Sequence, residues 1–188
     1  MNSICVFCGS SSGFDEIYAK SAASLGHEIA KRGLRLIYGG GNVGIMGRLA
    51  SIVLDEGGSV TGIIPEAIHK MVPHIEHAET IVVENMHSRK QKMHDLSDAF
   101  IALPGGIGTF EEILEAFTWS QLGFHQKPVA LLNTKSYYSP LLMQLNHSVD
   151  QGFMKESHKD TLIVDEDPIL LLDRMESYVP LTEDKWVK

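Results

Sequence analysis

Few features of this sequence point to export or to membrane insertion. It has only two cysteines among 188 residues, fewer than a secreted disulfide framework uses. The first ten residues, MNSICVFCGS, contain neither a basic segment nor a long apolar segment, so they do not predict a signal peptide. No apolar run reaches the roughly 20 residues of a membrane helix. We therefore expect a cytoplasmic protein with no membrane partner.

Positive charge is also scarce. Lysine and arginine total 16 against 24 acidic residues, which gives a net charge of -8. Non-specific binding to nucleic acid needs a positive surface, so the composition argues against a nucleic-acid partner. A small anionic ligand remains compatible with the composition, because such a ligand responds to the local field.

Short apolar runs alternate with longer amphipathic segments along the chain. The pattern predicts strands at 4–7, 34–38, 60–64, 80–83, 99–103, 129–132 and 162–164, and helices at 15–31, 45–54, 86–96, 110–122, 140–149 and 168–178. Continuously apolar strands between helices indicate an α/β fold with a doubly wound, Rossmann-like parallel sheet. We expect a single domain over residues 1–188. The irregular segment 66–77 is interpreted as a surface loop or a short helix.

Three glycine-bearing turns follow predicted strands: residues 9–11, 39–47 and 104–109. The carboxyl ends of parallel strands share one edge, where ligands bind. The turn from Gly39 to Gly44 matches G-x-G-x-x-G, which lets a backbone approach a phosphate or ribose. A dinucleotide is disfavoured, because the motif follows the second strand and only Glu66 lies near the end of the next one. A plain strand-to-helix turn explains part of this glycine run.

The turn at 104–109, PGGIGT, joins a predicted strand to a predicted helix. Its three glycines bare the backbone amides, and Thr109 is suited to capping the helix or to binding a phosphate oxygen. Glu112 lies three residues further on and could complete a capping box with Thr109, so its structural and functional interpretations stay open. Together with Glu111 and Glu115 it would also place three acids in the first turns of the helix.

A basic helical segment follows the fourth predicted strand. Met86, Arg89, Lys90 and Met93 share one helical face by their spacing. One interpretation is a solvated basic face with methionine contacts. The other is a pocket wall in which Met86 and Met93 contact a base while the cations contact a phosphate or a leaving group.

Several other chemistries lack support in the sequence. The Cys5–Cys8 C-x-x-C motif lies on a predicted strand, which favours buried free thiols over a redox pair. His69, His74 and His77 occur without H-E-x-x-H or a paired C-x-x-C, so no metal site is expected. The sequence has no Walker A motif and no G-x-S-x-G elbow, and it therefore supports neither an ATPase nor a serine hydrolase.

Two segments together resemble one protein family. PGGIGTFEE, residues 104–112, matches P-G-G-x-G-T-x-x-E, the signature of the Lonely Guy (LOG) family, and MHSRK, residues 86–90, matches its second signature. The segments 5–11, 38–47, 118–123 and 127–128 also look like that family. The resemblance extends from about residue 3 to residue 165.

This resemblance implies hydrolysis of the N-glycosidic bond of N6-substituted adenosine 5′-monophosphates, and of AMP itself, to the free base and ribose 5-phosphate. It implies a homodimer, no cofactor and no metal. Arg89 and Glu112 carry over as the catalytic residues. The positions that carry over as nucleotide-binding are Lys90, Gly105, Gly106, Gly108, Thr109, Glu111 and Thr118. The first two turns and the basic helix add Gly9, Ser10, Gly40, Gly41, Gly44, Met46, Gly47 and Met86 as candidate substrate contacts. Many relatives carry a further acidic substrate contact in the segment after Pro65, where this chain reads AIHKMV at residues 67–72.

Two other functions are compatible with the same turns. A Rossmann-like nucleotide carrier would bind without turnover, although binding alone does not require both Arg89 and Glu112. A lysine decarboxylase, a label given to many family members, would need pyridoxal phosphate, and the sequence gives no independent sign of a Schiff-base lysine.

Overall fold

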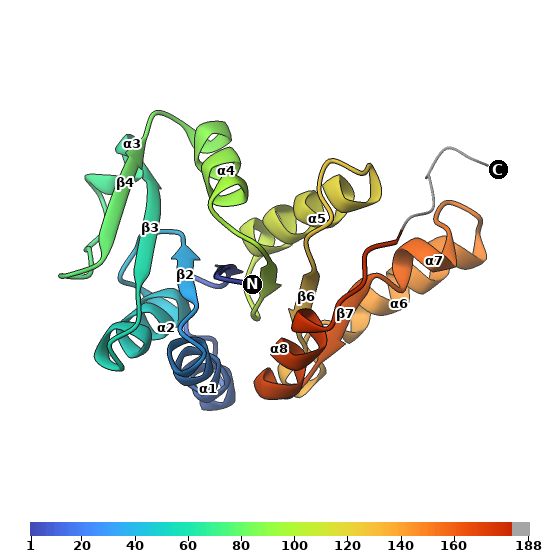
Figure 1. The fold of residues 1–188 in the computed structure, drawn as a ribbon, viewed down its shortest axis with the longest axis horizontal. Coiled ribbons are helices and arrows are strands. Elements are labelled where there is room, and N and C mark those ends of the chain that lie inside the picture. The colour runs from blue at the N-terminus through green and yellow to red at the C-terminus, as the bar shows by residue number, and fades with distance from the viewer. Residues whose placement is uncertain (182–188) are drawn as a thin grey trace.

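Seven strands pair in one parallel sheet in the order β4-β3-β2-β1-β5-β6-β7. A computed structural model describes residues 1–181 (Figure 1). Its strands are β1 (Ser3–Phe7), β2 (Arg35–Tyr38), β3 (Val60–Pro65), β4 (Glu79–Val83), β5 (Phe100–Ala102), β6 (Val129–Leu132) and β7 (Leu162–Asp165). Its helices are α1 (Glu16–Lys31), α2 (Gly44–Asp55), α3 (Glu66–His69), α4 (Met86–Asp95), α5 (Ile107–Gln121), the 3₁₀ helix η1 (Thr134–Ser136), α6 (Ser139–Asp150), α7 (Glu156–Lys159) and α8 (Pro168–Glu176).

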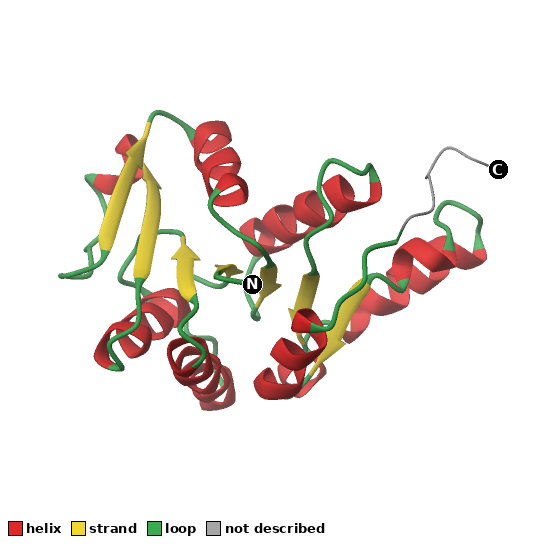
Figure 2. Ribbon diagram, in the orientation of Figure 1, coloured by secondary structure: helices red, strands yellow, loops and turns green. Residues whose placement is uncertain are grey.

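The sheet is covered by helices on both faces, as Figure 2 shows. Residues of every strand except the edge strand β4 are divided between two separate cores. On one face Ile4 and Leu36 pack with residues of α1, α2 and α8, and on the other Phe7 and Phe100 pack with residues of α4 and α5. Strands buried on both faces must be apolar throughout, which is the pattern that the sequence shows. The predicted Rossmann-like α/β fold is therefore confirmed.

The chain order places a topological switch between β1 and β5. From β1 the chain winds outward through β2, β3 and β4, and it then returns to pair β5 with the other side of β1. A crevice forms at the carboxyl ends of the strands where the winding direction reverses. The turns at 9–11, 39–47 and 104–109 follow β1, β2 and β5, three neighbouring strands, so all three lie at this edge as predicted.

The structure differs from the predicted elements mainly around α5. This helix begins at Ile107 with Gly106 as its N-cap, three residues before the predicted start. Thr109 therefore lies inside the helix, which rules out the interpretation of Thr109 and Glu112 as a capping box. The first turn of the helix contains no acidic residue, because Glu111 and Glu112 fall beyond it. Of the two methionines expected at the pocket, Met86 is exposed, whereas Met93 is 1% exposed and belongs to the core beneath α4.

Other predicted features agree with the structure or lie outside it. The segment 66–77 contains a short helix, α3, followed by a loop. The sequence pattern did not predict α7 or η1. The last seven residues of the predicted domain, 182–188, lie outside the described residues. Within residues 1–181, no helix combines the length and the apolar character that crossing a bilayer requires.

Candidate active site

The two catalytic candidates meet between α4 and α5. Arg89 Nη1 donates to Glu112 Oε1 at 2.9 Å, and the two side chains are 13% and 11% exposed. Arg89 Nε donates to the carbonyl of Ile63 on β3 at 3.0 Å, which fixes the plane of the guanidinium group. The local fold supports this arrangement, because Asn85 caps α4 by accepting from the amide of Ser88. Three elements, β3, α4 and α5, thus hold the pair at the carboxyl edge of the sheet.

Burial perturbs the Glu112 carboxylate. Desolvation raises the pKa of Glu112 above its usual value of 4.5, the charge of Arg89 acts in the opposite direction, and the charge of Glu111 adds to the increase. The net shift is upward. A partly dehydrated carboxylate interacts strongly with a positive charge that develops nearby, and such perturbed groups are typical of catalytic positions.

Lys90 lies beside this pair but faces other acids. Its Nζ contacts Glu111, and it also donates to Glu115 Oε2 at 2.8 Å. Burial alone would lower the pKa of Lys90, but the two carboxylates outweigh burial and raise it. Lys90 therefore joins α4 to α5 and holds the acidic face of α5 next to the arginine.

The three glycine turns pack closely against one another through their backbones and together form the floor of the candidate site. A Cβ atom on Gly44, which has φ +56°, would lie 2.6 Å from the amide nitrogen of Ser11. A Cβ on Gly105 would lie 2.8 Å from the amide nitrogen of Gly9. The first turn is thus sandwiched between the start of α2 and the turn before α5, and only glycine fits at these two contacts.

The second turn also passes under the arginine. A Cβ on Gly39 would lie 2.9 Å from Met46 Sδ and would collide with the guanidinium group of Arg89. Gly41 lies next to the side chains of Met46 and Val72. Met46, a predicted substrate contact, therefore forms part of the floor around Arg89.

The remaining candidates divide by exposure. Ser10, Met86, Gly106 and Gly108 are exposed, and the last two have no atom within 4 Å of an added Cβ. Gly40 and Gly47 are buried, with Ile64 and Asn42 as their neighbours. Thr109 is 4% exposed, and its Oγ1 lies against Gly105.

Thr118 is separated from the other candidates. It lies about 10 Å further along α5 than Glu111, at the helical rise of roughly 1.5 Å per residue. Its hydroxyl donates to the carbonyl of Leu114, and the side chain faces solvent.

Two cysteines border the site. Both are free in the structure. Burial, followed by the charge of Glu112, raises the pKa of Cys8 to about 12 and that of Cys5 well above its usual value. A thiol reacts as its thiolate, so these groups are unreactive at neutral pH. The interpretation of the C-x-x-C motif as free thiols is confirmed, with Cys5 buried and Cys8 partly exposed.

Metal-binding groups do not gather in the described part of the chain. No cluster of three or more histidine, cysteine or carboxylate side chains suited to a metal ion occurs within residues 1–181. His69 and His74 do approach each other, with ring centroids 4.1 Å apart, beside the second glycine turn.

One contact at the site lacks any motif in the sequence. The hydroxyl of Tyr137 donates to the carbonyl of Gly105 at 2.5 Å. Tyr137 follows β6, whose carboxyl end lies beside that of β5. That position was the only signal that could have placed it here.

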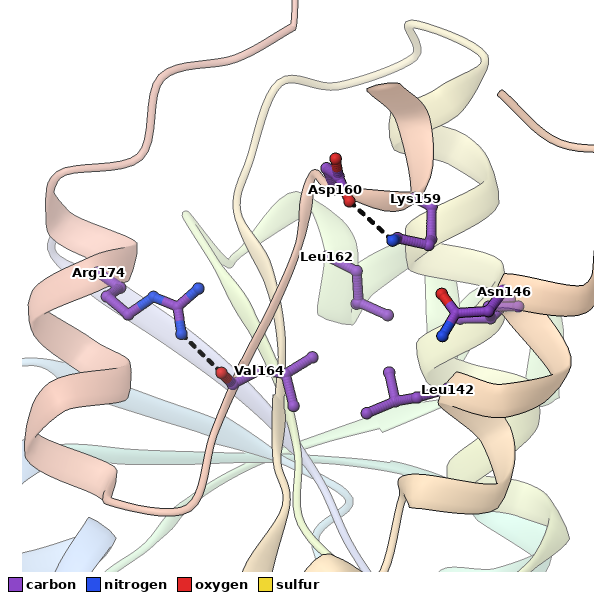
Figure 3. Close-up of a pocket in the computed structure, with 8 residues that line it drawn as sticks. Leu142, Asn146, Lys159, Asp160, Leu162, Val164 and Arg174 are labelled. Carbon is purple, nitrogen blue, oxygen red and sulfur yellow. Dashed lines mark hydrogen bonds and ion pairs between the residues drawn. The ribbon is translucent and has the colours of Figure 1, made fainter. Parts of the chain in front are cut away.

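A separate hollow lies at the β7 edge of the sheet (Figure 3). Lys159 and Arg174 lie on opposite sides of it, with the apolar side chains of Leu162 and Val164 between them. Both cations already have partners, since Lys159 contacts Asp160 and Arg174 donates to the carbonyl of Val164. None of the predicted site residues lines this hollow.

Comparison with known proteins gives consistent matches over the whole fold. Residues 46–175 match the family profile described as "Possible lysine decarboxylase". The chain is 46% identical over 182 residues to cytokinin riboside 5′-monophosphate phosphoribohydrolase LOG2 of Arabidopsis thaliana, covering 96% of this chain and 85% of that protein. It is 47% identical over 168 residues to cytokinin riboside 5′-monophosphate phosphoribohydrolase of Rhodococcoides fascians, covering 88% and 84%.

Solved structures share the architecture. The molybdenum cofactor binding protein of Rippkaea orientalis superposes with a TM-score of 0.71 at 25% identity, covering 94% of this chain and 96% of that one. The molybdenum cofactor carrier protein of Chlamydomonas reinhardtii gives a TM-score of 0.69 at 24% identity, covering 94% and 99%. At this level of identity the similarity establishes the fold.

Proposed function

The chain belongs to the Lonely Guy family of cytokinin riboside 5′-monophosphate phosphoribohydrolases, and from this premise we propose what its site does. It hydrolyses the N-glycosidic bond of adenosine 5′-monophosphates, including N6-substituted ones, and releases the free base and ribose 5-phosphate. The observation that carries this proposal is the largely buried Arg89–Glu112 pair at 2.9 Å, beside the glycine turn that opens α5.

Glu112 is proposed to act on the ribose. Cleavage of a glycosidic bond develops positive charge at C1′ and its ring oxygen. A buried carboxylate next to C1′ stabilises that charge and orients the attacking water. Burial of Glu112 supports this role, because electrostatic interactions strengthen where water is excluded.

Arg89 is proposed to act on the leaving purine and to hold Glu112 in place. The departing base gains negative charge, and a permanent cation with a rigid donor fork stabilises it. Nε donates to the Ile63 carbonyl and Nη1 donates to Glu112, which leaves Nη2 for the base. An arginine does not give up its proton, so the base must receive its proton from water.

The 5′-phosphate is proposed to bind at the start of α5. The amides of Gly106, Ile107, Gly108 and Thr109 lie in the first turn, where a helix favours an anion. The remaining candidate contacts around the ribose and base are Gly9, Ser10, Gly41, Met46 and Met86, with Gly40, Gly44 and Gly47 shaping the floor.

Lys90, Glu111 and Thr118 complete the proposed set in different ways. Lys90 and Glu111 form an ion pair at the border of the site, and Lys90 would reach a phosphate only by leaving its two carboxylates. Thr118, further along α5, would contact a large N6 substituent or a residue of a second subunit.

The alternative chemistry suggested by the family profile's description fits the residues poorly. A decarboxylase that uses pyridoxal phosphate needs a lysine whose amine is easily deprotonated. The lysine at this site, Lys90, lies between two carboxylates that raise its pKa. Lys90 is therefore unsuited to forming a Schiff base with pyridoxal phosphate.

Chromatography of AMP incubated with the pure protein tests the proposed function. Release of adenine is expected, at a rate proportional to enzyme concentration. Recovery of intact AMP, with binding detected by calorimetry, would instead indicate a carrier. An absorbance band of pyridoxal phosphate, together with CO₂ release from lysine, would favour the decarboxylase.

We also propose a homodimer in the cytoplasm. Apolar side chains stand exposed beside the site: Met86 is 42% exposed and Ile107 is 85% exposed. Burying such groups against a second copy is favourable, and free thiols at Cys5 and Cys8 are typical of a reducing compartment. Light scattering after gel filtration is expected to give twice the chain mass of 20.8 kDa.

A further inference from the structure

Every carbonyl of the turn before α5 has a hydrogen-bond donor within the protein. The hydroxyl of Tyr138 donates to Leu103 O at 2.6 Å, and the amide of Gly9 donates to Pro104 O at 3.2 Å. The hydroxyl of Tyr137 donates to Gly105 O at 2.5 Å. The fourth carbonyl, that of Gly106, accepts the first helical bond from the amide of Phe110 at 3.2 Å. The turn is therefore anchored through its acceptors.

The donors of the same turn are free. Within residues 1–181, the amides from Gly106 to Thr109 donate no hydrogen bond to the protein. In a trans peptide the C=O and N–H groups point in opposite directions. Holding the Gly105 carbonyl inward therefore aims the amide of Gly106 outward, toward the open space above Gly106 and Gly108.

The tyrosine that holds the Gly105 carbonyl is itself firmly placed. Its ring lies edge-on to Tyr18, with centroids 5.9 Å apart, and stacks on Phe110 at 6.4 Å with the planes 10° apart. It thereby contacts the first turn of α1 and the first turns of α5 together. Neither neighbour hydrogen-bonds to its hydroxyl, which leaves that group for Gly105.

A strained turn delivers Tyr137 to this place. The two residues before it, Lys135 and Ser136, have φ of 53° and 57°, a left-handed conformation that side chains disfavour. The turn is tied to the loop before α1 and to α1 itself, because Lys135 Nζ donates to Asp15 Oδ2 at 2.6 Å and Thr134 Oγ1 lies 2.7 Å from Ser21 Oγ. Backbone strain of this kind persists where the surroundings over-determine it, and it is frequent at functional sites.

We infer that Tyr137 is a positioning residue for the phosphate-binding amides. The hydroxyl donates to the Gly105 carbonyl and so fixes the orientation of the Gly105–Gly106 peptide. This keeps the Gly106 amide aimed at the 5′-phosphate. Tyr138 makes a similar bond two residues earlier, at the end of β5, and holds the strand rather than the phosphate contact. This inference rests on the proposed function, since it assigns Tyr137 to the phosphate side of that site.

The test compares Tyr137→Phe with Tyr138→Phe as a matched control. Each change removes one hydroxyl bonded to a backbone carbonyl and keeps the ring, so the aromatic packing that supports folding is retained. The measured quantities are the KM for AMP, kcat, the inhibition constants of ribose 5-phosphate and of adenine, and Tm. The two products separate the phosphate side of the site from the base side.

In Tyr137→Phe, the KM for AMP and the inhibition constant of ribose 5-phosphate are expected to rise by about 3- to 10-fold, as for the loss of one oriented hydrogen bond. The inhibition constant of adenine and kcat are expected to stay within about twofold. Tyr138→Phe is expected to lower Tm while leaving both inhibition constants unchanged. A purely structural role for Tyr137 would lower Tm and alter the adenine and ribose 5-phosphate constants equally.

Unchanged ribose 5-phosphate inhibition in Tyr137→Phe, with an active wild-type enzyme, would overturn the inference and leave the proposed function standing. If the wild-type protein released no adenine, the proposed function would fail instead. Calorimetric titration of both proteins with ribose 5-phosphate would still test Tyr137 in that case. Equal dissociation constants for the two proteins would count against it.

Discussion

Replacing Glu112 by glutamine tests the chemistry of the site most sharply. The substitution removes one negative charge and keeps the shape, and the amide oxygen of glutamine can still accept from Arg89 Nη1. At about 4 Å and an effective dielectric constant of about 20, a carboxylate stabilises a full positive charge by about 4 kcal/mol. The charge at C1′ is largely developed in the transition state, which gives roughly 3 to 4 kcal/mol, or about 10²- to 10³-fold in kcat/KM.

The assay follows adenine release from AMP by chromatography. Glu115→Gln is the matched control, because Glu115 lies one turn further along α5 and pairs with Lys90 instead of Arg89. The control is expected to stay within about threefold of the wild type, since Lys90 keeps its ion pair with Glu111 and the Arg89–Glu112 pair is left intact. A loss below tenfold in a folded Glu112→Gln protein would refute the role of the carboxylate.

The pH profile adds a second test of Glu112. The ionised carboxylate is the active form, and burial raises its pKa above the usual 4.5. As pH falls through this raised pKa, Glu112 gains a proton and kcat/KM is expected to fall with it. The acid limb should therefore lie above pH 4.5 and should be absent from the residual activity of Glu112→Gln.

Three further predictions concern the catalytic pair, the strained turn before Tyr137 and a buried histidine. Arg89→Gln removes the charge that lowers the pKa of Glu112, so the acid limb of the remaining kcat/KM should move to higher pH, as a pH–rate profile would show. Ser136→Gly relieves a left-handed residue and should raise the free energy of unfolding by about 1 kcal/mol in urea titrations, whereas an unchanged midpoint would argue against strain. Burial lowers the pKa of His94 from 6.5 to about 4, so the unfolded chain takes up a proton first as pH falls from 6.5 toward 4. Stability present above pH 6.5 is then lost, by roughly 2 to 3 kcal/mol in urea unfolding, and the loss should be smaller in His94→Phe.

The sequence pattern was sufficient for the sheet and for the edge that carries the site. Strands buried on both faces leave continuous apolar runs, and glycine turns mark their carboxyl ends, so the meeting of the turns after β1, β2 and β5 could be predicted. The start of α5 was misplaced because Gly106 and Gly108 resemble breakers. The structure shows Gly106 as the N-cap and Gly108 inside the first turn, where the open backbone is useful.

The spacing of residues in the sequence could not predict which side chains contact one another in the site. Arg89 and Glu112 lie 23 residues apart on different helices, and only the family resemblance brought them together before the structure did. The helical period places Met93 on the same face as Arg89, but in the structure the Met93 side chain packs in the core beneath α4. Tyr137 had no motif, since its bond to Gly105 depends on the pairing of β5 with β6 and on a strained turn.

The proposed reaction is defined by the bond of the nucleotide that breaks, which is the bond between C1′ and the base. Complete conversion of AMP by the wild-type protein, with every product quantified, tests it most directly. Cleavage of the N-glycosidic bond gives adenine and ribose 5-phosphate in equal amounts, with no adenosine and no inorganic phosphate. Adenosine with inorganic phosphate, or AMP recovered unchanged, would contradict it.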